Sequence, residues 1–150
     1  MRLTVFSDYA LRVLIFVALQ GKRRATVAEI AEGYDISRSH LMKVVQRLSA
    51  LGYLETIRGK GGGLTLAQPP ADIRIGTLLR ATEEGSAIVE CMGEGGKCRI
   101  TPACALPGMF DRALDSFFAE LDHYTLADLV ENPQRLKPLL AKESSSPLEV

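Results

Sequence analysis

Three cysteines lie close together in the segment CMGEGGKCRITPAC, residues 91–104. They are Cys91, Cys98 and Cys104, the full complement of this 150-residue chain, and their spacing is C-x6-C-x5-C. An odd number of thiols cannot all pair as disulfides, and cysteine usually avoids exposed loops unless its chemistry is used. Because thiolates bind soft and borderline metals, the pattern favours a metal or redox site over three idle thiols.

The spacing of the cysteines narrows the kind of metal site. The C-x2-C pairs that are typical of zinc sites are absent. Iron–sulfur clusters normally take four protein ligands, mostly cysteine. Three cysteines therefore leave the fourth position to an aspartate, a glutamate, a histidine, a solvent molecule or another subunit. Three glycines between the first two cysteines let the segment wrap around a cluster, and Lys97 and Arg99 would offset the thiolate charge.

Residues 26–54 have the pattern of two helices joined by a turn. Thr26 and Glu29 match a capping box that starts a short helix, Gly33 is expected to form the turn, and Ser37 is expected to cap a longer helix. The apolar residues of this second helix follow the helical period: Leu41, Val44, Val45, Leu48 and Leu51. Next, YLETIR and GLTLA alternate like strands around a basic tip, GKGG. We therefore predict a mainly α chain with a winged helix-turn-helix and a small β-hairpin wing.

The two predicted helices and the wing together predict a DNA-binding surface. The second helix fits the major groove, and the tip of the wing carries further cations. The candidate contacts are Ser37, Arg38, Ser39, His40, Lys43 and Arg47 on the helix, and Arg58 and Lys60 on the wing. Residues 1–68 hold ten Lys/Arg against five Asp/Glu, a balance of +5, whereas residues 69–150 hold eight against thirteen, a balance of −5. The alternative is a solvated polar face on an ordinary helix, with His40 as a plain surface histidine.

The first helix is expected over residues 7–21, with Ser7 as its cap. Asp8 and Arg12 precede the apolar run VLIFVAL (13–19) and interrupt the apolar stretch at the N-terminus, and the run is far too short to span a bilayer, so we expect a cytoplasmic protein rather than an exported one. No nucleotide-binding loop or catalytic dyad is apparent, which predicts a protein that is not an enzyme.

The second half contains a heptad stripe of apolar residues with 4-3-4-3 spacing, Phe110, Leu114, Phe117, Leu121 and Tyr124. It predicts a long C-terminal helix that dimerises with its twin; the alternative is that it packs on its own domain, with His123 as a packed or solvated residue. Thr125 and Asp128 match one more helix cap. The expected division is a winged helix-turn-helix domain at 1–85, a cysteine segment at 86–106, a dimerisation helix with its cap at 107–132, and a flexible tail at 133–150.

Several motifs together carry a resemblance to a known family. DYALR (8–12), LSALGYL (48–54), RGKGGGLTLA (58–67) and the three spaced cysteines resemble the winged-helix iron–sulfur repressors of the IscR and NsrR type. The resemblance covers residues 1–132. CRITPAC (98–104) and HYTLADLVEN (123–132) resemble specifically the nitric-oxide-sensing members of that family.

The resemblance implies a homodimer with one cluster per subunit, held by Cys91, Cys98 and Cys104. In the nitric-oxide-sensing members a [4Fe–4S] cluster takes a fourth ligand from helix 1 of the other subunit, and the matching residue here is Asp8. Pro107 stands where IscR-like members have a ligand histidine, which weighs against the alternative [2Fe–2S] arrangement. From the residues alone, Asp8 is instead a first-turn carboxylate or the i+4 partner of Arg12. Six residues separate the first two cysteines, where relatives often have five.

The function that the resemblance implies is a repressor of a pseudo-palindromic DNA operator. Nitric oxide would release the repressor by nitrosylating or destroying the cluster. One alternative is a regulator that senses iron–sulfur supply, oxygen or redox state. A small iron–sulfur electron carrier is a further alternative, but it leaves the basic helix and the wing without a role.

Overall fold

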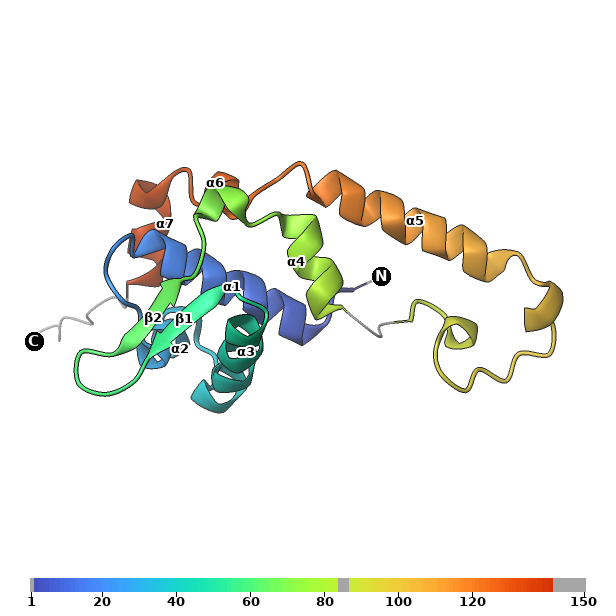
Figure 1. Cartoon of the computed structure of the whole chain (residues 1–150), viewed down its shortest axis with the longest axis horizontal. Helices are drawn as coiled ribbons and strands as arrows, with labels where there is room; N and C mark the ends of the chain where they lie inside the picture. The colour runs from blue at the N-terminus through green and yellow to red at the C-terminus, as the bar shows by residue number, and fades with distance from the viewer. Residues whose placement is uncertain (1, 84–86, 142–150) are drawn as a thin grey trace, which may run out of the picture.

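Helix α1 (Val5–Leu19) runs through the centre of the DNA-binding part of the molecule in this computed structural model, which describes residues 2–83 and 87–141 (Figure 1). The helix is buried because it is apolar almost all round. It begins two residues before the predicted cap. Thr4, not Ser7, is the N-cap, and its hydroxyl accepts the backbone N–H of Ser7 at 3.2 Å. Ser7 lies inside the helix and is fully buried.

Helices α2 (Val27–Tyr34) and α3 (Arg38–Ala50) form the expected helix-turn-helix. The predicted capping box is present, with reciprocal hydrogen bonds between Thr26 and Glu29. Ser37 caps α3 by accepting the backbone N–H of His40 at 3.4 Å. The prediction that Gly33 forms the turn is wrong. Gly33 lies within α2, and the left-handed residue of the turn is Asp35, with φ of 53°.

Strands β1 (Leu54–Ile57) and β2 (Gly63–Leu66) form the wing, an antiparallel hairpin in which Leu54 pairs with Leu66. Ala25, which lies two residues before α2, extends this hairpin. The N–H of Ala25 donates to the Leu64 carbonyl at 3.0 Å, and the N–H of Leu64 donates to the Ala25 carbonyl at 2.7 Å. The wing is therefore fastened to the helix-turn-helix through backbone hydrogen bonds as well as through the buried Leu54 and Leu64.

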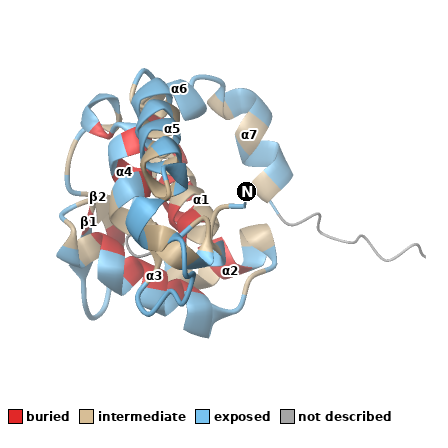
Figure 2. Ribbon diagram, turned by 90° about the vertical axis from the view of Figure 1, so that its right-hand side faces the viewer, coloured by how far each residue is buried: buried red, intermediate tan, exposed pale blue. Residues whose placement is uncertain are grey.

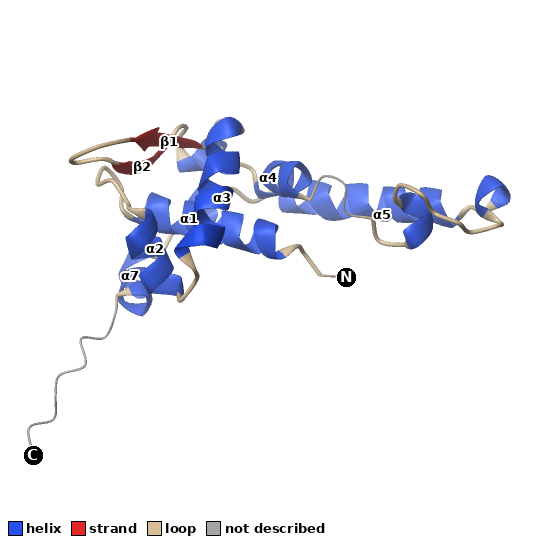
Figure 3. Ribbon diagram, turned by 90° about the horizontal axis from the view of Figure 1, so that it is seen from below, coloured by secondary structure: helices blue, strands red, loops and turns tan. Residues whose placement is uncertain are grey.

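After a 3₁₀ turn (Pro70–Asp72) and helix α4 (Ile75–Thr82), the chain leaves the winged domain. Two 3₁₀ turns, Glu90–Met92 and Thr101–Ala103, lie in the cysteine segment, and the long helix α5 (Leu106–Leu121) returns toward the domain. Figures 1 and 3 show α5 and the cysteine segment as an arm that extends to one end of the molecule.

The chain past α5 rejoins the winged domain. Thr125 and Asp128 make the predicted cap of α6 (Leu126–Leu129), and Leu126 is fully buried in the core. Residues 133–140 were expected to belong to the flexible tail, but they form helix α7 (Pro133–Leu140), which packs against α2. Its proline at the first helical turn is well placed because that N–H would have no helical partner. Residues 142–150, the rest of the expected tail, lie outside the described residues.

The hydrophobic core lies around α1 and is built from the winged domain together with Leu126 of α6 (Figure 2). It is aliphatic apart from Phe16, and its largest fully buried side chains include Leu14, Ile30, Leu41, Leu48, Ile73, Leu78 and Leu126. The arm contributes no residue to this core. Among the described residues, no helix combines the length and the apolar character that crossing a membrane requires.

Candidate DNA interface and cysteine segment

The outer face of α3 is polar because its apolar face is held in the core. Leu41, Val44 and Leu48 are buried, and α3 packs against α1 and α2. The residues on the other side of α3 therefore present their side chains to solvent. All of the residues predicted to contact DNA are exposed: Ser37, Arg38, Ser39, His40, Lys43, Arg47, Arg58 and Lys60. The helix and the tip of the wing project toward the same lower side of the molecule in Figure 1.

Arg24 is a cation at the wing that the sequence analysis did not single out. It precedes α2, and its guanidinium donates to the carbonyl of Gly61 at the wing tip. The two residues are 37 positions apart, so no local pattern indicates the contact. Arg24 therefore adds positive charge to the tip that carries Arg58 and Lys60, and it restrains the position of that tip.

Two further exposed residues lie on the outer face of α3, Met42 and Gln46. They follow Ser39 by three and seven residues, which places all three on one strip of the helix. That spacing is visible in the sequence.

His40 is not simply a solvated surface residue, because its ring lies 6.4 Å from the ring of Tyr9 on α1. Around this pair, Val5, Phe6, Lys43 and Val44 complete the lining of a small hollow between the two helices, with a volume of about 160 Å³. The start of the recognition helix thus packs against the first turns of α1. Asp8 is the neighbour of Tyr9 in that helix.

Asp8 forms the predicted ion pair with Arg12. Its Oδ2 lies 2.9 Å from Nη2 of Arg12, and its Oδ1 accepts a hydrogen bond from Nε at 3.2 Å. Both carboxylate oxygens are therefore engaged within the same helix. The two side chains remain 46% and 40% exposed, so the pair is accessible from outside the molecule.

The cysteine segment carries three free thiols. Cys91 and Cys104 are half-buried and Cys98 is exposed. The backbone N–H of Leu106, at the start of α5, donates to Sγ of Cys104 at 3.4 Å. Within residues 2–83 and 87–141, no three His, Cys, Asp or Glu side chains converge closely enough to hold an ion. The structure thus gathers the thiols in one segment without bringing their sulfur atoms to a common centre.

Two observations test whether this segment suits a thiolate-bound cluster. Gly96 folds back on the first cysteine so closely that an added Cβ would lie 2.8 Å from Cα of Cys91. Oγ1 of Thr101 is buried and has no hydrogen-bond partner among the described atoms. Thr101 lies between Cys98 and Cys104 in the sequence, so its unpaired hydroxyl is a donor that a sulfur atom of this segment could accept. The three thiols are a donor set that suits an iron–sulfur cluster, and the segment would have to close further to bring the three sulfur atoms together.

Hydrogen bonds connect the first turn of α1 to the end of α4. The N–H and the hydroxyl of Thr4 both donate to Oε1 of Glu83, at 2.8 and 2.9 Å. The buried Ser7 hydroxyl donates to Oγ1 of Thr82 at 2.7 Å. These residues are more than 70 positions apart, and the sequence analysis did not find them. They fasten the helix that carries Asp8 to the helix that leads into the arm.

Asp122, just after α5, is the main polar link between the arm and α4. It accepts hydrogen bonds from Thr77 N–H at 2.6 Å and from Thr77 Oγ1 at 2.9 Å, and it pairs with Arg80 at 2.6 Å. The hydrogen bond from Arg80, together with those from Thr77, lowers the pKa of Asp122 below 3.8 despite some desolvation. The two helices touch at Gly76, where an added Cβ would lie 2.1 Å from the Phe118 carbonyl.

The heptad stripe lies along α5, apart from Tyr124, which follows the end of the helix. None of the residues of α5 is buried, and the stripe residues Phe110, Leu114, Phe117 and Leu121 are only half-buried. Part of α5 packs on α4, as the alternative reading expected, but the rest of its apolar side is open. His123 is exposed in the turn that follows α5.

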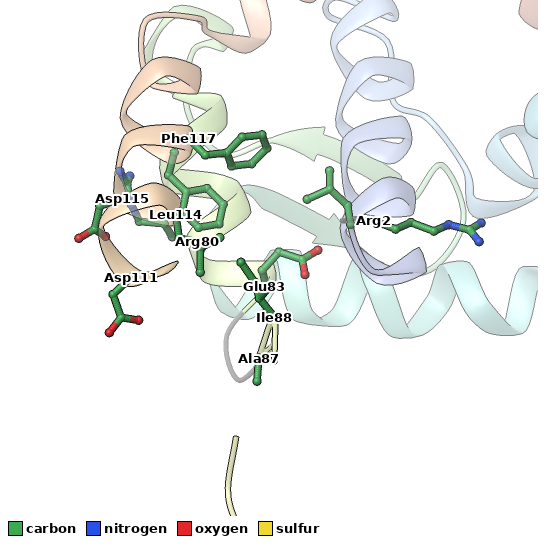
Figure 4. A pocket seen from close by; sticks show the side chains of 11 residues that line it. Arg2, Arg80, Glu83, Ala87, Ile88, Asp111, Leu114, Asp115 and Phe117 are labelled. Atoms are coloured by element: carbon green, nitrogen blue, oxygen red, sulfur yellow. The ribbon is translucent and has the colours of Figure 1, made fainter. Parts of the chain in front are cut away.

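A hollow of about 510 Å³ lies beside α5, between it, the end of α4 and the N-terminal segment. Leu114 and Phe117 point into this hollow, and Glu83 and Ile88 lie on its other side (Figure 4). The open apolar side of α5 therefore continues into a concave surface that nothing in the described part of the chain fills.

Comparison with protein families relates nearly the whole chain to one group of regulators. The model of the Rrf2 family, described as an iron-dependent transcriptional regulator, matches residues 3–132. The HTH-type transcriptional regulator NsrR of Bacillus subtilis is 48% identical over 142 residues, which cover 93% of this chain and 97% of the relative. NsrR of Geobacillus kaustophilus is 46% identical over the same shares of the two chains.

Solved structures agree with this relationship. The structure of CymR (YrzC), the global cysteine regulator of B. subtilis, has a TM-score of 0.68 at 26% identity and covers 87% of this chain and 97% of that one. IscR of T. potens has a TM-score of 0.69 at 23% identity, with 88% of each chain covered, which shows the shared fold. The predicted mainly α winged helix-turn-helix is thereby confirmed.

Proposed function

Because the chain belongs to the Rrf2 family of transcriptional regulators, we propose that it is a homodimeric repressor that senses nitric oxide through an iron–sulfur cluster. Its relatives are named as regulators rather than enzymes. DNA binding follows from that membership and accounts for the exposed basic face of α3 and the wing. We choose nitric oxide as the signal because the chain is similar to NsrR relatives, which are up to 48% identical over nearly its full length.

In this proposal Cys91, Cys98 and Cys104 hold the cluster as thiolates. The bound [4Fe–4S] cluster supplies iron that reacts with nitric oxide. The N–H of Leu106 already donates to Sγ of Cys104, and the Thr101 hydroxyl is available as a second donor to sulfur. Hydrogen bonds of this kind tune the reduction potential of such clusters. Support for the site therefore comes from the polar groups around the thiols as well as from the thiols themselves.

Asp8 would supply the fourth ligand from the partner subunit. The cysteine segment lies at the far end of the arm, away from α1 of its own chain (Figures 1 and 3). A second copy is therefore the natural source of this carboxylate. Arg12 contacts each oxygen of Asp8 once in the single chain, so both oxygens keep a lone-pair site at which iron could bind. Arg12 would then hold the carboxylate in place as an outer-shell partner.

The same contacts offer a route from the cysteine segment to the DNA. Ligation would hold α1 through Asp8, and Tyr9 of that helix packs against His40 at the start of the recognition helix. Loss of the ligands would free α1 to shift, and His40 with it. Thr4 and Ser7 link α1 to α4, so the arm and the first helix would move together. DNA affinity and ligand retention would then favour the same conformation.

The experiment that tests this function is anaerobic purification followed by iron and sulfide analysis. We expect about four irons per chain, and visible absorbance that disappears when nitric oxide is added. DNA affinity should be measured before and after the addition, on a duplex selected by the protein from a random pool. It should fall on nitrosylation, and it should also fall steeply as salt rises. A protein that cannot be loaded with iron anaerobically would contradict the proposal.

One observation favours a second candidate, a regulator that senses iron or iron–sulfur supply. The matching family is described as iron-dependent. This candidate predicts that iron depletion alone releases the DNA, and that nitric oxide has no effect while the cluster can be rebuilt. The same anaerobic preparation separates the two, since each signal can be applied to it alone.

A further inference from the structure

Met42 is an apolar side chain on the otherwise polar outer face of α3. It is 63% exposed, and among the residues of α3 it is the sole large hydrophobic residue on the surface. The other apolar residues of the helix, Leu41, Val44, Val45 and Leu48, face the core. A single exposed hydrophobic residue needs no explanation by itself. Met42 is of interest because it lies on the helix that is expected to contact DNA.

The neighbours of Met42 on this strip all present hydrogen-bonding groups. Ser39 lies three residues before it, Gln46 lies four residues after it, and Lys43 is adjacent; all three are exposed. Residues three and four apart on a helix are surface neighbours, so Met42 sits in the middle of a polar patch. Its thioether is only a weak acceptor, so it adds an apolar contact to a surface that otherwise offers donors and acceptors.

Duplex DNA presents one distinctive apolar group in the major groove, the C5-methyl of thymine. Met42 is the fifth residue of α3, within the N-terminal half that approaches base edges in helix-turn-helix proteins. Its unbranched side chain adapts readily to an apolar partner. We propose that Met42 determines part of the operator sequence by packing against the C5-methyl of one thymine in each half-site. The inference rests on the proposed DNA-binding function.

The test compares thymine with deoxyuridine, which differs from it only in lacking this methyl group. The full-length wild-type protein selects a duplex from a random pool. Each thymine of that duplex is then replaced singly by deoxyuridine, and the dissociation constants are measured. At the contacted thymine we expect the wild type to lose about fourfold in affinity, the effect of one methyl-sized apolar contact. Met42→Ala should bind the two duplexes equally.

Two further variants make the comparison specific. Met42→Leu keeps an apolar side chain of similar volume and should keep the discrimination between thymine and deoxyuridine. Lys43→Ala removes a neighbouring cation, so it should weaken binding to both duplexes by the same factor and leave the discrimination unchanged. Both substituted positions are exposed, so neither variant disturbs the core.

The inference is overturned if Met42→Ala retains the wild-type discrimination, or if no thymine of the selected duplex is sensitive to loss of its methyl group. The first result would assign the methyl contact to another residue, and the second would mean that no methyl contact exists. If the protein enriches no duplex at all, DNA recognition itself fails, and this contact fails with it. The outcomes for the function and for Met42 are therefore distinguishable.

Discussion

Asp8 has two roles, as the ion-pair partner of Arg12 and, in our proposal, as a cluster ligand. In the single chain each of its oxygens contacts Arg12 once. Because a carboxylate has about four lone-pair sites, both oxygens keep a site for iron, and Arg12 could orient the carboxylate toward the cluster. Because the pair is nearly half exposed, breaking it has little effect on folding, which allows the ligand role to be tested without unfolding the domain.

We expect Asp8→Ala to keep a cluster bound by the three cysteines but to change its absorbance and shorten its lifetime in nitric oxide. The free energy of unfolding should change by no more than about 0.5 kcal/mol, the usual worth of an i,i+4 pair. Absorbance during anaerobic titration with nitric oxide and chemical denaturation measure the two effects.

Arg12→Gln is the matched control for Asp8→Ala, because it breaks the same ion pair and leaves the carboxylate in place. It should retain the wild-type absorbance. If Asp8→Ala and the wild type have the same spectrum and the same response to nitric oxide, Asp8 is not a ligand, and the fourth position belongs to another group.

Cys98→Ala is expected to abolish iron and sulfide binding and leave the fold intact. Cys98 is exposed, so the loss of its thiol should change the free energy of unfolding by less than about 0.5 kcal/mol. Ile100→Ala, a change at an exposed residue of the same segment that offers no ligand, should keep the full iron content. A complete cluster in Cys98→Ala would remove Cys98 from the ligand set.

At the scale of elements, the contact between α4 and the end of α5 determines how the arm is attached to the winged domain. Gly76 allows the two helices to touch, and Asp122 bonds the first turn of α4 while it pairs with Arg80. Asp122 is only 22% exposed, so these bonds are partly shielded from water. Within one chain, this contact and the hydrogen bonds between α4 and α1 join the arm to the DNA-binding part of the molecule.

Asp122→Asn should lower the free energy of unfolding at neutral pH by about 1 kcal/mol, because the charge that pairs with Arg80 and faces the start of α4 is lost, whereas an amide oxygen can still accept from Thr77. The folded-state pKa of Asp122 is depressed below 3.8. Its contribution to stability is therefore complete above the unfolded-state pKa and disappears as pH falls through the folded-state value.

Thermal unfolding of the wild type and Asp122→Asn across a pH series measures this contribution. The difference between their midpoints should be constant from pH 7 down to about 5 and should close at lower pH. A difference that stays the same in strong acid would mean that the charge of Asp122 is not what stabilises the contact.

At the scale of the whole molecule, the arm has an apolar side that its own chain leaves largely uncovered. It has no buried residue on α5, and a hollow of about 510 Å³ lies beside it. At 1.5 Å per residue, the 16 residues of α5 form a rod of about 24 Å. Two such rods packed along their stripes would bury the apolar side and place two recognition helices on one DNA duplex.

Phe110→Asp should convert a dimer into a monomer of 16.3 kDa, because a carboxylate in an apolar contact costs on the order of 2 kcal/mol or more. Sedimentation velocity measures the mass, and circular dichroism checks that the helices remain. Leu139→Asp introduces the same charge at an 80% exposed leucine on α7 and should leave the mass of the assembly unchanged. A dimeric Phe110→Asp would place the interface elsewhere.

The sequence by itself determined the features that arise from residues close together along the chain. The Thr26–Glu29 capping box, the Ser37 cap, the wing and the Asp8–Arg12 pair all appear as predicted, because each depends on a spacing of a few residues. The helical period likewise indicated which side of α3 faces the core. The type and spacing of the three cysteines predict a metal or redox site, and their role as ligands stays a prediction.

The tertiary structure alone decided which distant residues meet. Ser7 has the pattern of a helix cap, yet it is buried against Thr82, and Arg24 reaches the wing tip across 37 residues. Residues 133–140 look like a loose tail but form α7, because α2 offers a surface for them to pack on. Such contacts depend on how separate elements are arranged in space, and no local spacing encodes that arrangement.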